Sequence, residues 1–133
     1  MTLNLDWGRW PNFTETEMRC KCGCGRADMD PGFMDRLQAM RGKTPTPFIV
    51  TSGYRCPDYN DRIAKTGRNG PHTTGHAVDL LCSGAHAHEA LFLAAAEGMT
   101  GIGVAQRGDH VSRFLHLDDL PVGNYPRPGV WSY

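Results

Sequence analysis

The chain has 133 residues, a length that suits one domain built around one modest hydrophobic core. Hydrophobic residues make up 40% and charged residues 21%, so the composition indicates a folded globular protein and excludes a disordered one. The 14 basic residues balance the 14 acidic residues. A formal net charge of zero gives no support to nucleic acid or an anionic membrane as a partner.

Residues 1–7 lack a basic stretch followed by an apolar one, so we predict no signal peptide. No apolar run approaches the roughly 20 residues that cross a bilayer, so we expect no membrane insertion. We therefore expect synthesis in the cytoplasm, with release by another component if the protein acts outside the cell. We also expect the protein to act as a monomer.

Five cysteines are present, and three of them alternate with other residues at Cys20, Cys22 and Cys24. An odd number of cysteines without a secretion signal argues against a disulfide framework. We interpret residues 19–25 as a glycine-rich turn with reduced thiols. A zinc knuckle is the alternative, although the spacing is not Cys-x2-Cys and no second pair lies nearby. Cys56 is interpreted as a buried core residue.

The first half of the chain predicts two helices after an N-terminal arm, residues 1–12, packed by its tryptophans. Thr14 and Glu17 have the spacing of a capping box. Asp30–Pro31 is a strong helix start, and Gly42 is the predicted end. Between these two points apolar residues recur at three- and four-residue steps, as on the buried face of a helix: Phe33, Met34, Leu37 and Met40.

A strand is predicted at residues 48–51, and a helix at 57–65 with Tyr59 and Ile63 packed inward. Turn-forming residues at 67–71 predict a loop. Later elements are predicted in this order: a strand at 77–82, a helix at 85–97, a strand at 102–104, a strand at 112–118, and a Pro/Gly-rich tail at 121–133 packed on the core. This order favours a single α+β domain over residues 1–133, with helices on one face of a small, mostly antiparallel sheet.

A histidine and an aspartate seven residues apart, His72 and Asp79, lie around the start of the predicted strand at 77–82. Imidazole and carboxylate groups are common ligands of divalent transition metals. His116, in the strand at 112–118, is the natural third ligand if the two strands pair. Two histidines and one carboxylate leave a fourth tetrahedral position open for water, as in catalytic zinc sites. We therefore expect one zinc ion.

Three segments together resemble a known family: Ser52-Gly53-Tyr54-Arg55, His72-Thr73-Thr74-Gly75-His76-Ala77-Val78-Asp79 and Phe114-Leu115-His116-Leu117-Asp118. They resemble the zinc D-Ala-D-Ala carboxypeptidases and L-alanyl-D-glutamate endopeptidases, murein metallopeptidases that share a fold with the Hedgehog signalling domain. The cysteine segment and the tail from Arg127 to Tyr133 resemble a branch common in bacteriophage and prophage proteins. The resemblance extends from about Phe13 to the C-terminus.

The resemblance implies that His72, Asp79 and His116 bind the zinc. It implies that Arg55, with Ser52 and Tyr54 in the same segment, binds substrate, because a guanidinium meets a carboxylate as a planar fork. It also implies a tight backbone turn at Gly75.

The general base departs from the family pattern. Well-known branches place an acidic residue or a histidine three positions before the last ligand, where this chain has Arg113. Arginine cannot accept a proton at neutral pH. Asp118 and His110 are the candidate replacements, with Asp109 behind them. Asp118 has a second interpretation, as a carboxylate that orients a ligand histidine.

We therefore predict a zinc metallopeptidase that cuts a peptide bond in the stem peptides of bacterial peptidoglycan, as a phage or prophage endolysin passed through the inner membrane by a holin. The alternative is a zinc-containing module that binds murein, or stabilises a phage particle, without turnover. The sequence leaves open which murein bond is cut.

Overall fold

Alternating apolar residues in two central strands set the layers of the fold. The computed structural model describes residues 3–133. Its helices are α1 (Glu15–Met18), α2 (Pro31–Gly42), α3 (Pro57–Ile63) and α4 (Gly84–Ala96). Its strands are β1 (Ile49–Ser52), β2 (Ala77–Leu81), β3 (Gly101–Ala105), β4 (Phe114–Asp118) and β5 (Gly129–Ser132). Short 3-10 helices are η1 (Trp7–Arg9), η2 (Gly67–Asn69), η3 (Pro71–Thr74) and η4 (His110–Ser112).

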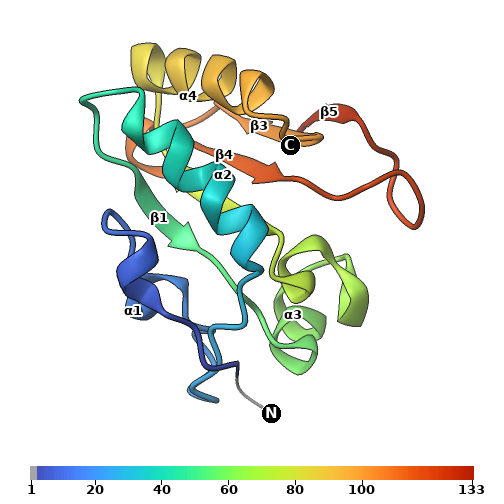
Figure 1. Ribbon diagram of the computed structural model, residues 1–133. Coiled ribbons are helices and arrows are strands. Elements are labelled where there is room, and N and C mark those ends of the chain that lie inside the picture. The colour runs from blue at the N-terminus through green and yellow to red at the C-terminus, as the bar shows by residue number, and fades with distance from the viewer. Residues whose placement is uncertain (1–2) are drawn as a thin grey trace.

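The five strands form one mixed sheet in the order β1-β2-β4-β3-β5. All neighbouring pairs are antiparallel except β3 and β5, which run parallel. Helices α2 and α4 cover one face of this sheet, and α3 lies beyond one end of β1 and β2 (Figure 1). The predicted α+β class with a mostly antiparallel sheet is therefore confirmed.

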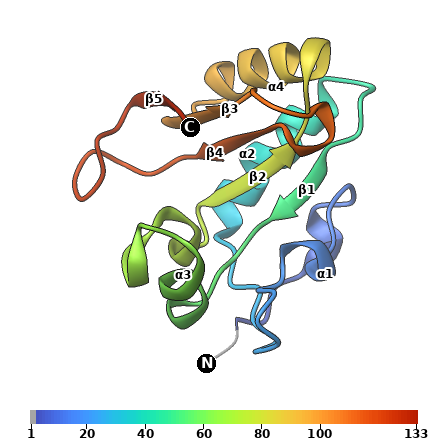
Figure 2. The same ribbon diagram turned by 180° about the vertical axis from the view of Figure 1, so that it is seen from behind.

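The hydrophobic core lies between the sheet and the two long helices. Side chains alternate between the faces of a strand. Val78 and Leu80 of β2, with Leu115 and Leu117 of β4, are buried in the core with the apolar face of α2. The intervening residues of β2 and β4 must project from the opposite face, which is the one seen in Figure 2. That opposite face carries the polar residues Asp79, His116 and Asp118.

Local signals predicted the N-terminal helices well. Thr14 and Glu17 form the predicted capping box at the start of α1. The Asp30 carboxylate accepts a hydrogen bond from the Phe33 backbone N–H at 2.9 Å, so α2 begins where the sequence placed it. Its four predicted apolar residues are all fully buried.

One prediction about packing was wrong, and one strand was not predicted. Ile63 of α3 is 51% exposed, and the inward position is taken by Asn60, whose amide donates to the Thr66 hydroxyl and the Gly67 carbonyl. The C-terminal tail contains a strand that the sequence analysis did not predict, β5, which forms one edge of the sheet beside β3.

None of the helices within residues 3–133 combines the length and the apolar character needed to cross a membrane.

His76, the residue before β2, forms an ion pair with Asp119, the residue after β4. Its Nδ1 lies 2.7 Å from an Asp119 carboxylate oxygen, and Arg36 of α2 lies 3.3 Å from the other oxygen. The hydrogen bond with Asp119 raises the pKa of His76 against the opposing effect of burial. The protonated imidazole therefore stabilises the fold.

This contribution gives a pH-dependent prediction. It is fully present below the unfolded-state pKa of about 6.5 and is lost as pH rises through the higher folded-state value. His76→Gln should therefore lower the free energy of unfolding more at pH 5.5 than at pH 8, as measured by urea denaturation. In an Asp119→Asn background the pH-dependent part of this difference should shrink. An equal loss at both pH values would contradict the assignment.

Candidate metal centre

Asp79 and His116 face each other across the two central strands. They are direct partners in the antiparallel register of β2 and β4, which brings Cβ atoms to within about 4.5–5.5 Å. Asp79 Oδ1 lies 3.2 Å from His116 Nδ1, and both residues are buried. Strand pairing alone therefore places a carboxylate and an imidazole together on the face of the sheet opposite the helices.

His72 completes the group from outside the sheet. It lies in η3, which ends at Gly75 with φ of 79°, the left-handed conformation that glycine adopts at little cost. The sequence had predicted a tight turn at this glycine. A Cβ at position 75 would also lie 2.3 Å from the Asp28 carbonyl oxygen, so the chain passes too close there for any other residue. The turn leads directly into β2 and holds His72 beside Asp79.

The three ligand atoms form a nearly equilateral triangle. His72 Nε2 lies 3.2 Å from Asp79 Oδ1 and 3.3 Å from His116 Nδ1, and the third side is also 3.2 Å. Zinc binds such atoms at about 2.0–2.2 Å, and tetrahedral geometry then separates neighbouring ligands by roughly 3.3–3.5 Å. The donor set and its spacing therefore fit one zinc ion with an open fourth position.

Each imidazole has the tautomer that a metal ligand requires. His72 Nδ1 lies 2.8 Å from the Gly53 carbonyl oxygen, which can only accept, so Nδ1 carries the proton and Nε2 is free. His116 Nε2 lies 2.7 Å from Asp118 Oδ2, so its proton is on Nε2 and Nδ1 is free. Partners of this kind orient the ligands of metal sites.

Asp118 lies behind His116 and is completely buried. Arg127 donates to both of its oxygens, from Nε to Oδ1 at 2.8 Å and from Nη2 to Oδ2 at 2.7 Å. This fork pairs the buried carboxylate with a charge of opposite sign. Gly101 makes room for the pair, since a Cβ there would lie 2.3 Å from Asp118 Oδ1. Asp118 is thus placed to orient His116, the second of the two roles considered for it.

The C-terminal strand places an aromatic side chain beside the candidate metal centre. The Trp131 ring of β5 lies 5.2 Å from the His116 ring, and the Arg127 guanidinium lies 4.8 Å from the Trp131 ring. Tyr133, further along, packs against Phe114 of β4 at 5.2 Å. Burial raises the pKa of Tyr133. The nearby charge of Asp79 raises it further, whereas a hydrogen bond with Trp131 and the charge of Arg55 lower it. The tail therefore borders the candidate site.

Arg55 lies on the other side of Asp79. Its Nη2 donates to Asp79 Oδ2 at 3.4 Å, its Nε to the Ser52 hydroxyl at 3.0 Å and its Nη1 to the Asn60 side-chain oxygen at 3.1 Å. These contacts use three of the five guanidinium N–H groups, and each terminal nitrogen keeps one more. The Arg55 side chain is mostly but not fully buried, and its contact with Asp79 places the guanidinium beside the metal centre.

The electrostatics follow from this packing. Burial opposes the charged form of Asp79, but the close His116 and His72 imidazoles outweigh it and hold the carboxyl pKa well below its ordinary range. Burial likewise opposes protonation of His116, yet Asp118 and Asp79 raise its pKa. Burial would raise the pKa of Asp118, but its hydrogen bonds with Arg127 and His116 lower it to about 2. Both carboxylates are therefore ionised at neutral pH.

The other predicted site residues lie apart from the three ligands. Tyr54 is 3% exposed and belongs to the hydrophobic core, with Arg26 stacked on its ring at 5.2 Å, so this burial does not suit contact with a substrate. His110 and Asp109 are exposed at η4. No hydrogen bond or ion pair found within residues 3–133 joins either of them to the metal centre.

Sequence reasoning assigned no role to Asn60, Arg127 or Trp131, which support Arg55, Asp118 and His116. Only Arg127 and Trp131 gave a signal, as part of the tail that resembles phage proteins.

A protein-family model described as Peptidase M15 matches residues 11–118 of the chain. This range contains all three candidate ligands and Arg55. No curated protein matches significantly.

The contact between Asp118 and His116 gives a prediction about metal affinity. Asp118→Asn should lower the zinc affinity of the His72–Asp79–His116 site by about 10- to 100-fold, because His116 loses the anion that orients it. This is the ion that His116→Ala should remove. Competition with a chromogenic chelator measures this affinity. Asp109→Asn, an exposed change outside the site, is the matched control. Equal affinities for wild type and Asp118→Asn would show that the carboxylate does not act on the ligand.

Proposed function

Because this chain belongs to the peptidase M15 family, we propose that it is a zinc metallopeptidase that cuts the stem peptides of bacterial peptidoglycan. The observation that carries the proposal is the triangle of His72 Nε2, Asp79 Oδ1 and His116 Nδ1, whose sides measure 3.2, 3.2 and 3.3 Å. A zinc ion bound there would supply a Lewis acid that activates water and polarises the scissile carbonyl.

Neighbouring residues of the chain hold the three metal ligands in position. The Gly53 carbonyl and Asp118 fix the two histidines, and Arg55 holds the outer oxygen of Asp79. Ligands fixed in advance do not have to reorganise when substrate binds. Arg55 retains N–H donors for a carboxylate or carbonyl of the peptide, which accounts for its position beside the metal centre.

Stem peptides are the proposed substrate for two reasons. The segments around Arg55, His72 and His116 resemble those of murein carboxypeptidases and endopeptidases. Stem peptides also carry carboxylates, which a guanidinium recognises well. The resemblance of the tail to phage proteins further supports an endolysin that is released onto the cell wall by a holin.

Hydrolysis of purified peptidoglycan tests the activity. Zinc-loaded protein should release new amino termini, a chelator should stop the release, and added zinc should restore it. His116→Ala should reduce the rate to background, whereas His88→Ala, an exposed change on α4, should leave it unchanged. Absence of new amino termini from the zinc-loaded wild type would contradict the proposal.

Arg55 gives a second prediction. A hydrogen bond to a charged group contributes about 1.5–3 kcal/mol, or about 10- to 100-fold in an equilibrium or rate ratio. Arg55→Lys keeps the charge but loses the fork, so kcat/KM for a stem peptide should fall by about that factor while zinc stays bound. Steady-state kinetics with parallel zinc analysis separates the effects. Unchanged kcat/KM would exclude Arg55 from substrate binding.

A second candidate function is retention of peptidoglycan without turnover. The burial of Asp118, with both oxygens engaged by Arg127 and His116, favours it, because this carboxylate is not free to move a proton. Arg113, at the position of the family's usual base, donates instead to the Gly108 carbonyl. Cosedimentation with insoluble peptidoglycan, without new amino termini, would establish this function in place of hydrolysis.

A further inference from the structure

Four cysteine side chains meet at a second place in the molecule, away from the histidine site. Cys20, Cys22 and Cys24 lie in the turn after α1, and Cys56 is the residue that precedes α3. Each offers one sulfur, and all four sulfurs lie within 4.8 Å of one another. The sequence analysis had interpreted Cys56 as a core residue and had found no partner for the other three.

The spacing of the sulfurs suits a metal and not a disulfide. Cys22 Sγ lies 3.4 Å from Cys20 Sγ and 3.6 Å from Cys56 Sγ, and all four residues are free cysteines. Zinc binds thiolates at about 2.3 Å, so tetrahedral coordination separates neighbouring sulfurs by roughly 3.8 Å. These two separations are close to that value, and the others are no longer than 4.8 Å.

The backbone supports the same arrangement. The Cys56 N–H donates to Cys20 Sγ at 3.3 Å, and the Cys24 N–H donates to Cys22 Sγ at 3.4 Å. Hydrogen bonds to the charged form of a group favour that form, so these bonds would suit bound thiolates. Within the same turn, Lys21 Nζ donates to the Thr51 carbonyl of β1 at 2.6 Å. The turn is thereby held against the segment that contains Cys56.

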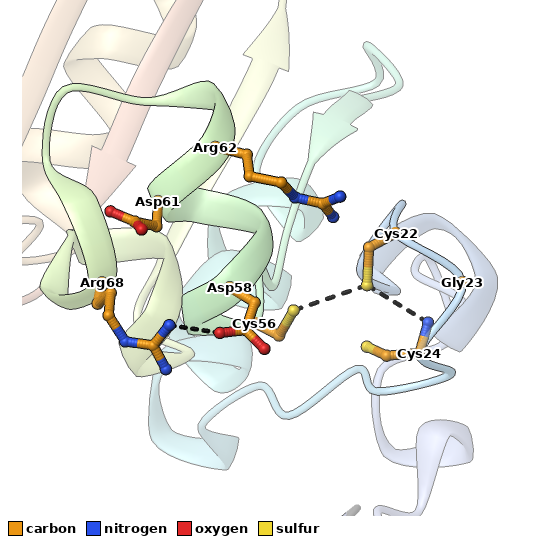
Figure 3. A pocket seen from close by; sticks show the side chains of 8 residues that line it. All are labelled: Cys22, Gly23, Cys24, Cys56, Asp58, Asp61, Arg62 and Arg68. Atoms are coloured by element: carbon orange, nitrogen blue, oxygen red, sulfur yellow. Dashed lines mark hydrogen bonds and ion pairs between the residues drawn. The ribbon is translucent and has the colours of Figure 1, made fainter.

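The site is open on one side. Cys22, Cys24 and Cys56 line a surface depression with Asp58, Asp61, Arg62 and Arg68, and the three sulfurs point toward one another in Figure 3. Cys20 and Cys56 are buried, Cys22 is half-buried and Cys24 is exposed. An ion therefore has a path to the sulfurs from solvent. Arg62 reaches over the same depression, where its positive charge would offset the excess negative charge of four thiolates on a divalent ion (Figure 3).

We propose that Cys20, Cys22, Cys24 and Cys56 form a structural zinc site that ties the turn after α1 to the loop between β1 and α3. Four thiolates in a tetrahedron are typical of structural zinc, and a closed set of protein ligands leaves no position for catalysis. The tied loop contains Gly53 and Arg55, which contact His72 and Asp79. Zinc at the thiols therefore stabilises the segment that orients the candidate metal centre.

Zinc analysis of the purified, reduced, zinc-saturated protein tests the proposal. Wild type should hold two zinc ions per chain, and His116→Ala should keep one. Cys24→Ser should also keep one and should melt at a lower temperature. Cys24 is exposed, so the loss of a solvent-facing thiol has no other reason to lower stability. Cys82→Ser, which changes a cysteine outside the cluster, should still hold two ions.

Cobalt substitution gives an independent test that does not depend on activity. Cobalt-loaded His116→Ala should show the intense sulfur-to-metal charge-transfer absorption of a thiolate site, and Cys24→Ser should weaken it. A single zinc ion in wild type that His116→Ala removes, or cobalt-loaded His116→Ala without the absorption band, would overturn the proposal. Neither result would affect the histidine site, so failure here is distinct from failure of the proposed peptidase.

Discussion

The pairing of Asp79 with His116 across β2 and β4 is the constraint on which the rest of the site depends. One antiparallel register puts both side chains on the face away from the helices, while their neighbours Val78, Leu80, Leu115 and Leu117 fill the core. A slip of one residue would turn the ligands toward the helices and the leucines away from them. The hydrophobic core therefore holds the metal centre in register.

Residues outside the two strands fix the orientation of the ligand side chains. The Gly53 carbonyl and Asp118 select the tautomers of the two histidines, and Arg127 neutralises Asp118 from β5's side of the sheet. The proposed thiolate site would act one step further out, on the loop that carries Gly53 and Arg55. The candidate peptidase centre thus draws on segments from the cysteine turn to the C-terminal strand.

Sequence reasoning predicted those parts that local signals determine. Asp30 and Pro31 mark the start of α2 through capping chemistry, and the three ligand segments are readable because each carries its residues at short, fixed spacing. The roles of Asn60, Cys56 and Arg127 depend on segments that meet only in the folded chain, so no local pattern reveals them. Strand β5 was missed because a short edge strand in a Pro/Gly-rich segment has almost no periodicity to detect.

Anomalous X-ray scattering from zinc-loaded crystals, recorded on both sides of the zinc absorption edge, would locate the metal and identify its ligand atoms. We expect a zinc peak bonded to His72 Nε2, Asp79 Oδ1 and His116 Nδ1, with His116 Nε2 still hydrogen-bonded to Asp118. A zinc peak coordinated by His116 Nε2 in place of Nδ1, or the absence of a zinc peak between these three residues, would contradict the proposed metal centre.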